Sequence, residues 1–213
     1  MSEWFRRKAD KINTSLKKDT REGTWMKCPS CLEVISRKIA NEKNGCCNSC
    51  NHHFRINSDQ YVEIILDDGY CELWDNIKSL DPLNFNATQP YKEQIDNSIN
   101  KTNKSDAISI FKGKIISEDV MLCIMDFSFI GGSMGSVVGE KLSRAIGRAQ
   151  DEHLPLIIVC SSGGARMQEG VISLMQLAKV CSKLSDFCSQ KNLLVTLLTD
   201  PTMGGTTASY GML

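Results

Sequence analysis

The chain has 213 residues, ten cysteines and a formal net charge of zero at pH 7. This length allows one fair-sized domain and a small module. A composition of 41% hydrophobic and 23% charged residues is ordinary for a globular protein. No apolar run approaches the roughly 20 residues needed to span a bilayer. Ten cysteines without a secretory signal favour a reducing, cytosol-type compartment.

Charge is distributed unevenly along the chain. Residues 1–57 carry twelve Lys and Arg against six Asp and Glu, and residues 58–106 carry four against ten. Residues 107–213 are balanced at nine each, so we expect separate modules. Their expected bounds are 1–22 for a basic mobile tail, 23–56 for a small module, 57–106 for a helical and loop-rich linker packed on the main domain, and 107–213 for an α/β domain. A tail helix on a membrane or nucleic acid is the less favoured alternative.

Four cysteines have the spacing of a structural zinc site. Cys28 and Cys31 form one CxxC pair, and Cys47 and Cys50 form another after fifteen intervening residues. Two such knuckles close a tetrahedron of thiolates around Zn²⁺ and leave no open position, so the predicted metal is structural. A module this small has too little core to fold alone, and metal binding supplies the missing free energy. Chance spacing of free cysteines is the alternative.

The neighbours of these cysteines leave two questions open. Cys46 could compete as a ligand, although only Cys47 preserves the CxxC knuckle. We interpret His52 and His53 as a polar shoulder of the ribbon that, with Arg55, could contact anionic groups. The basic surroundings therefore make RNA or DNA contact a secondary hypothesis.

Downstream of the ribbon, the pattern predicts two helices and then strands. Asn57 starts a cap signal before a short helix that ends near Leu66, and a second helix is predicted over 91–100. A strand pair is predicted over 108–116 and 120–125, with a turn between them.

A glycine-rich loop over 129–140 then leads into a helix with Leu142, Ile146 and Ala149 on one face. Gly131 and Gly132 are adjacent in this loop. Two interpretations stay open for it: close packing of helix on sheet, or a ligand wall that must be lined by backbone.

Residues 155–205 predict the order strand, glycine turn, helix, strand, glycine turn. The apolar run 156–160 has the pattern of a buried strand and leads to Gly163 and Gly164, while the run 193–198 leads to Gly204 and Gly205. The helix between them is predicted from an apolar stripe at three- and four-residue spacing: Val171, Leu174, Met175, Ala178, Cys181, Leu184 and Cys188. Turns that follow successive strands of such a unit meet at one edge of the sheet, where ligands usually bind.

Glycine turns expose N–H groups that suit a phosphate, a carboxylate or an oxygen on which charge develops during a reaction. Neither turn has a Walker pattern or a Gly-x-Ser-x-Gly elbow. None of the three histidines lies in the glycine-rich core, so a Ser–His–Asp triad lacks its base. Glu169 lies beside Arg166 and is expected to form an ion pair with it. These exclusions favour oxyanion stabilisation by main-chain donors.

Several long motifs occur in one order: CPSC, CNSCNHHFRI, FIGGSMGSVVGEK, SSGGARMQEG, LMQLAK and TDPTMGGTTASYGML. Over about residues 23–213 the chain resembles the carboxyltransferase β subunit of bacterial and plastid acetyl-CoA carboxylase. The resemblance implies an α/β fold: a small four-cysteine zinc ribbon followed by a crotonase-like ββα superhelix.

The resemblance also implies roles for the residues singled out above. Gly204 and Gly205 would donate N–H groups to an oxyanion, the enolate of the thioester. The four ribbon cysteines would hold zinc, and the acetyl-CoA pocket would be lined by Gly131, Gly132, Gly163 and Gly164.

The implied reaction is transfer of a carboxyl group from carboxybiotin, carried in trans on the biotin carboxyl carrier protein, to acetyl-CoA, which gives malonyl-CoA. The biotin ureido group would accept the proton. The implied partners are a carboxyltransferase α subunit in an α₂β₂ assembly, the carrier protein and biotin carboxylase, in the bacterial cytosol or a plastid stroma. The family's domain continues past the last glycine motif, so we expect a partial domain, inactive without the α subunit. A zinc-ribbon nucleic-acid-binding protein with a non-catalytic α/β domain is the alternative.

Overall fold

The structure is a computed structural model that describes residues 24–212. The tail predicted over 1–22 lies outside the described residues. The chain divides into two compact units, and the division falls between Phe54 and Arg55. None of the helices within residues 24–212 is long and apolar enough to cross a membrane.

The first unit is small and built around its cysteines. A two-stranded antiparallel sheet and one short helix form it: β1 (Trp25–Lys27), β2 (Val34–Ser36) and α1 (Arg37–Glu42). Its buried hydrophobic core consists of Cys28, Ile35, Ala40 and Cys47. Two of these four side chains are predicted zinc ligands, so little apolar surface is left to stabilise the unit without a metal.

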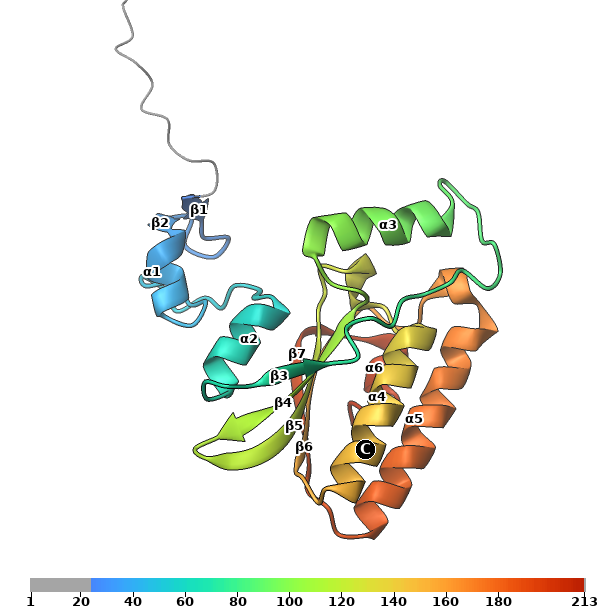
Figure 1. Cartoon of the computed structure of the whole chain (residues 1–213). Helices are drawn as coiled ribbons and strands as arrows, with labels where there is room; N and C mark the ends of the chain where they lie inside the picture. Colours follow the sequence, from blue (N-terminus) through green and yellow to red (C-terminus); the bar gives the residue numbers. More distant parts are fainter. Residues whose placement is uncertain (1–23, 213) are drawn as a thin grey trace, which may run out of the picture. The chain divides into compact units, whose positions relative to one another are not determined.

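The second unit contains a five-stranded mixed sheet in the order β3-β4-β5-β6-β7 (Figure 1). The strands are β3 (Cys71–Leu73), β4 (Ile108–Ile115), β5 (Glu118–Met125), β6 (Leu156–Ser162) and β7 (Leu194–Thr202). The first three pair antiparallel, and β5, β6 and β7 pair parallel. The predicted strand pair is confirmed, with its turn at Ile116 and Ser117.

The helices confirm most of the sequence expectations. They are α2 (Ser58–Ile65), α3 (Tyr91–Thr102), α4 (Ser136–Asp151), α5 (Val171–Ser189) and α6 (Gly204–Thr207), with short 3₁₀ turns η1 (Ile130–Gly132) and η2 (Met167–Glu169). Asn57 caps α2 in a capping box: its side chain accepts the Gln60 N–H at 2.9 Å, and the Gln60 side chain accepts the Asn57 N–H at 3.1 Å. Part of the expected linker 57–106 therefore forms regular elements of the second unit, including β3.

Both faces of the sheet are covered, which explains the unbroken apolar run of β5. Met121 and Cys123 lie in the core cluster that contains buried residues of α4 and α5. Leu122 and Ile124 lie in a second cluster, with Val62 of α2. Alternate side chains of one strand thus point to two different cores, and each needs an apolar residue.

Apart from Leu184, the apolar stripe that predicted α5 is not the face that the helix buries. Val171, Leu174 and Met175 are 67%, 52% and 59% exposed, whereas the buried positions are Ser173, Gln176, Val180, Leu184 and Phe187. The run that predicted β7 is also largely exposed, because β7 is an edge strand with a neighbour on one side only. The helix and the strand were predicted correctly, but the expectation of a second buried strand was wrong.

Candidate functional site

The four predicted ligands converge in the first unit. The sulfur atoms of Cys28, Cys31, Cys47 and Cys50 all lie within 4.8 Å of one another. The Cys28–Cys50 and Cys31–Cys47 sulfur distances are 3.6 and 3.8 Å. A tetrahedral zinc site with Zn–S bonds of about 2.3 Å has sulfur atoms about 3.8 Å apart. The arrangement therefore fits a Zn²⁺ ion and resolves the choice between Cys46 and Cys47 in favour of Cys47.

The surroundings of these thiols also favour a cation. The backbone N–H groups of Cys50 and Ser49 lower the pKa of Cys47 to about 7. For Cys31 the Glu33 N–H acts in the same direction, but desolvation and the other three sulfurs outweigh it and raise its pKa to about 12. The thiolate form is thus favoured at Cys47 and opposed at Cys31, and a bound cation would stabilise it at both.

The glycine turns of the second unit meet at one edge of the sheet. A Cβ placed on Gly204 would lie 3.3 Å from the Gly164 Cα and 3.5 Å from the Gly163 carbonyl oxygen. The Ser162 carbonyl accepts the Met203 N–H at 2.9 Å, which joins the ends of β6 and β7. The two turns therefore face each other in van der Waals contact, as expected for successive parallel strands.

The two turns differ in which N–H groups they leave free. The Gly163 N–H donates to the Gly131 carbonyl at 2.9 Å, and the Gly164 N–H donates to Ser162 Oγ at 3.0 Å. Within residues 24–212, the N–H groups of Gly204 and Gly205 have no hydrogen-bond acceptor. Only the second turn thus offers both of its amides to a ligand. Because α6 has only four residues, the amides themselves, rather than a helix dipole, are the donors.

Gly131 and Gly132 differ in which of the two interpretations of their loop, close packing or a ligand wall, fits them. A Cβ on Gly132 would lie 2.1 Å from the Ser161 carbonyl oxygen, so this position requires glycine for close packing against β6. Gly131 also has a positive φ, of 65°, but no atom lies within 4 Å of a Cβ there. Packing therefore accounts for Gly132, and Gly131 borders open space.

A buried polar cluster lies behind the glycine turns. The predicted Arg166–Glu169 pair is confirmed, with an N–O distance of 3.6 Å. Asp106 is a closer partner of the guanidinium, at 2.7 and 2.9 Å, and the Tyr91 hydroxyl donates to Glu169 at 2.7 Å. Sequence reasoning missed Asp106 and Tyr91, because both lie in the segment 57–106, in which no functional constellation was expected.

The ionisation of this cluster follows from its contacts. Burial alone would raise the pKa of Glu169, but the Ser136 N–H, the Tyr91 hydroxyl and Arg166 outweigh it and hold that pKa below its usual value. Burial raises the pKa of Tyr91, so the phenol stays protonated and donates. Glu169 is therefore an ionised acceptor rather than a proton donor.

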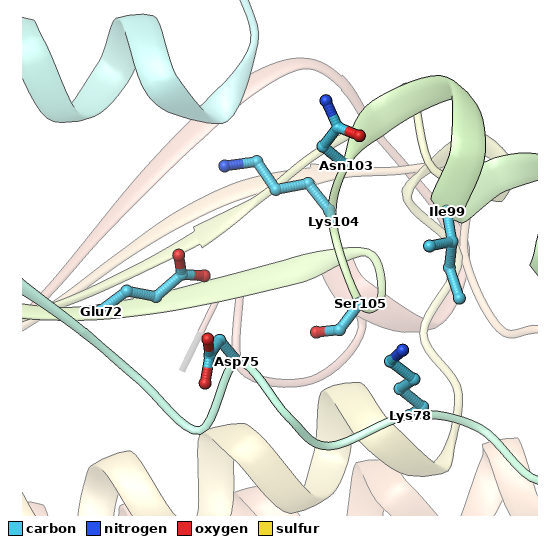
Figure 2. Close-up of a pocket in the computed structure, with 7 residues that line it drawn as sticks. All are labelled: Glu72, Asp75, Lys78, Ile99, Asn103, Lys104 and Ser105. Carbon is cyan, nitrogen blue, oxygen red and sulfur yellow. The ribbon is translucent and has the colours of Figure 1, made fainter.

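A polar pocket of about 310 Å³ lies beside the start of β4, and Figure 2 shows its lining. Two carboxylates and two amines are among the residues that line it: Glu72, Asp75, Lys78, Ile99, Asn103, Lys104 and Ser105. Ser105 Oγ accepts a hydrogen bond of 2.8 Å from the buried amine of Lys141. None of the predicted site glycines lines this pocket, so we treat it as separate from the glycine edge.

Solved structures share this fold. One is a hetero-tetramer of Pseudomonas malonate decarboxylase in complex with malonate. Its matching chain is 20% identical to this one, with a TM-score of 0.54 over 72% of this chain and 54% of that chain. Another is a hetero-dimer of Pseudomonas malonate decarboxylase, and its matching chain is also 20% identical. The TM-score is 0.53 over 72% of this chain and 57% of that chain. At this identity the likeness establishes the fold alone, and the crotonase-like α/β prediction is confirmed.

Sequence comparison defines the class more narrowly. Residues 78–210 match the family described as the carboxyl transferase domain, so the second unit is a carboxyl transferase domain. The "Acetyl-coenzyme A carboxylase carboxyl transferase subunit beta" of Pedobacter heparinus is 45% identical over 99% of this chain and 76% of its own length. That of Prosthecochloris aestuarii is 43% identical over the same shares. The chain belongs to this family of carboxyl transferase beta subunits, as its motifs predicted.

Proposed function

We propose that the chain is the β subunit of an acetyl-CoA carboxylase carboxyltransferase, which transfers a carboxyl group from carboxybiotin to acetyl-CoA to give malonyl-CoA. Family membership supports this proposal and favours it over the nucleic-acid-binding alternative. The observation that carries it is the pair of unpartnered amides at Gly204 and Gly205, which face the turn of Gly163 and Gly164.

The role that we assign to Gly204 and Gly205 is to bind the thioester oxygen. When the methyl group of acetyl-CoA loses a proton, negative charge develops on this oxygen. Two N–H groups that have no internal acceptor can donate to the oxygen without first breaking a bond in the protein. Removing one donor of this kind typically costs about 10²–10³ in rate. The turns also bring Gly131, Gly163 and Gly164 to the proposed thioester-binding edge, where side chains would narrow the path of the thioester.

We assign no proton acceptor among the side chains of the glycine edge. Glu169, the carboxylate that follows the first glycine turn, is fully buried and already accepts hydrogen bonds from Ser136 and Tyr91. Carboxybiotin would supply the carboxyl group, and its ureido nitrogen would accept the proton once the bond from that nitrogen to the carboxyl carbon has broken. The residues of this chain hold the thioester and stabilise its charge.

The ribbon has a structural role in this proposal. Four cysteine ligands leave no open position on a zinc ion for water or substrate. We therefore expect about one tightly held Zn²⁺ per chain, bound by Cys28, Cys31, Cys47 and Cys50.

The proposed partners follow from the reaction. An α subunit, in an α₂β₂ assembly, binds the biotin side, and the carrier protein and biotin carboxylase deliver the carboxyl group. None of the ten cysteines, all of which lie within residues 24–212, forms a disulfide, which suits a reducing cytoplasm or plastid stroma.

Nucleic-acid contact through the ribbon stays a prediction. Two of the side chains that suggested it have other contacts: His53 Nδ1 lies 3.6 Å from Cys46 Sγ, and Arg55 lies over the Phe127 ring at 5.0 Å. A charge engaged in this way is less free to bind a phosphate.

Two substitutions at Gly205 test the proposal, with the protein purified as a complex with its α subunit. Gly205→Pro removes the N–H, and proline is tolerated in the first turn of a helix. Gly205→Ala keeps the N–H and adds a Cβ that would lie 3.3 Å from Leu177 Cδ2, a side chain that can move. We expect kcat of malonyl-CoA-dependent biotin carboxylation, the reverse reaction, to fall about 10²–10³-fold in the proline variant. The alanine variant should lose far less.

Equal activity of the two variants would remove the Gly205 amide from the mechanism. If the unaltered complex showed no carboxyl transfer while RNA bound tightly and was released by salt, the binding-module alternative would replace the proposal.

A further inference from the structure

The buried cluster behind the glycine turns is more polar than stability alone requires. Arg166, Glu169 and Tyr91 have no exposed surface, and Asp106 is only 1% exposed. Replacing a buried ion pair by apolar residues of similar volume is often neutral or stabilising. Four such groups, of which Arg166 and Glu169 directly follow the Gly163–Gly164 turn, therefore need a further explanation, and their contacts supply one.

Arg166 joins two glycine loops that are more than 30 residues apart in the sequence. Its Nε donates to Ser133 Oγ at 3.0 Å, and its Nη2 donates to the Ser133 carbonyl at 2.8 Å. The backbone adds two bonds: the Arg166 N–H to the Met134 carbonyl at 2.9 Å, and the Met134 N–H to the Gly164 carbonyl at 2.8 Å. Asp106 fixes the guanidinium plane from the other side with two parallel bonds, a geometry that lysine could not reproduce.

Glu169 fixes a second part of the same loop. Its Oε2 accepts the N–H of Ser136, the first residue of α4, at 2.5 Å. Its Oε1 accepts the hydroxyls of Tyr91 at 2.7 Å and Ser79 at 3.0 Å. A Cβ on Gly135 would lie 2.7 Å from Oε1, so the carboxylate fits only because this residue is glycine. Glu169 thus holds α4 and the segment 79–91 to one point.

These contacts determine where the free amides lie. Gly164 is bonded to the Arg166 segment through Met134, and Gly204 packs against it so closely that a Cβ added to Gly204 would lie 3.3 Å from the Gly164 Cα. A shift of the Gly164 turn would move the Gly204–Gly205 amides away from the thioester oxygen. Such displacement matters, since a misplacement of about 1 Å can cost about 100-fold in rate.

We propose that Arg166 and Glu169 are positioning residues for carboxyl transfer, and that Tyr91 links them to α3. This inference rests on the proposed function above. The cluster does not touch the substrate, because its side chains are buried beneath the turns. It acts by keeping the glycine turns in the geometry that stabilises charge in the transition state.

The experiment uses Tyr91→Phe and Glu169→Gln in the complex with the α subunit. Tyr91→Phe removes only a hydroxyl that donates to Glu169 and accepts from Arg166 Nη1 at 3.1 Å. Glu169→Gln removes the charge and leaves one oxygen to serve three donors. We expect kcat to fall about 10-fold or more in Tyr91→Phe and about 100-fold in Glu169→Gln, with KM for the thioester changed less than about threefold. A fold-only role would not give this division between kcat and KM.

Ser58→Ala is the matched control. The Ser58 hydroxyl also donates to a buried carboxylate, Asp126, at 2.9 Å, but among the described residues Ser58 is not itself hydrogen-bonded to a side chain of the Arg166 cluster. We expect this variant to lose stability and keep its kcat. The double variant Tyr91→Phe/Glu169→Gln should be little slower than Glu169→Gln alone, because Tyr91 is proposed to act mainly through its bond to Glu169, which both changes disrupt.

Each outcome decides the inference. An active, folded Tyr91→Phe complex with kcat within about twofold of the unaltered enzyme overturns it, even if Glu169→Gln fails to assemble. A fall in kcat equal to that of Ser58→Ala, at the same loss of melting temperature, also overturns it. If the unaltered complex itself transfers no carboxyl group, the proposed function fails instead.

Discussion

In the ribbon, four side chains on two knuckles converge on one point, and the bonding groups are thiolates. At the glycine edge, the proposed donors are the main-chain amides of Gly204 and Gly205, and the Arg166 side chain is bonded to the neighbouring loop at Ser133. The first site is local in sequence, whereas the second needs three segments brought together by the sheet. We therefore expect the cysteine cluster to need its metal ion in order to fold. The Gly204 and Gly205 amides instead need the surrounding sheet to hold them in place.

Breaking the ribbon should have the largest effect. Cys47→Ser removes a ligand from a unit with only four buried core residues, and structural zinc contributes about 10–16 kcal/mol in small zinc-folded peptides. We expect bound zinc to be lost and residues 24–54 to become sensitive to protease, as metal analysis and limited proteolysis would show. The second unit should stay folded.

Cys46→Ser is the control for this prediction, because Cys46 is the adjacent thiol but lies outside the four-sulfur cluster. It should leave the zinc content unchanged. Zinc retained in Cys47→Ser, or lost in Cys46→Ser, would contradict the assigned ligand set.

Breaking the buried pair should have the next largest effect and should fall on the second unit alone. Asp106→Asn leaves the Arg166 charge buried without its bidentate partner. Removing one member of a buried ion pair typically costs about 3–5 kcal/mol. Urea unfolding should show a fall of this size in the free energy of unfolding, with zinc content unchanged. A loss below about 1 kcal/mol would mean that Glu169 or water compensates for the missing carboxylate.

Acid should have a smaller effect on the second unit, acting through Asp126. Burial raises the pKa of this carboxyl, but hydrogen bonds from Ser128 and Ser58 outweigh it and lower the pKa. A folded-state pKa below the unfolded value stabilises the protein above the unfolded value, about 3.9, and this contribution is lost as pH falls through the folded value. The free energy of unfolding should therefore decrease below about pH 4.

Asp126→Asn should flatten that decrease, since the variant has no proton to bind at this position. Unfolding curves measured between neutral pH and the acid limit would show it. Identical pH profiles for the two proteins would mean that other carboxyl groups carry the acid sensitivity.

Much of the fold could be predicted because the relevant patterns are local. The CxxC spacing gave the ligand set, the Asn57 cap gave the start of α2, and the glycine turns after two apolar runs gave the meeting edge. The motifs gave the family, which the relatives confirm. Each of these signals lies within a few tens of residues.

The remainder could not be predicted because it depends on tertiary contacts. Periodicity located α5 but not its buried face, since Val171 and Met175 have the same spacing as a core stripe yet stay exposed. Asp106 lies 60 residues before Arg166, and no local pattern joins them. Which glycine amides are free also depends on partners such as Gly131 and Ser162, which take up the Gly163 and Gly164 N–H groups.

The most direct measurement is a crystal structure of the complex with its α subunit and an acetyl-CoA analogue that has a ketone in place of the thioester. The account predicts that the ketone oxygen lies about 2.7–3.1 Å from the nitrogens of both Gly204 and Gly205. An oxygen bound elsewhere, with those two amides bonded to protein groups, would contradict it.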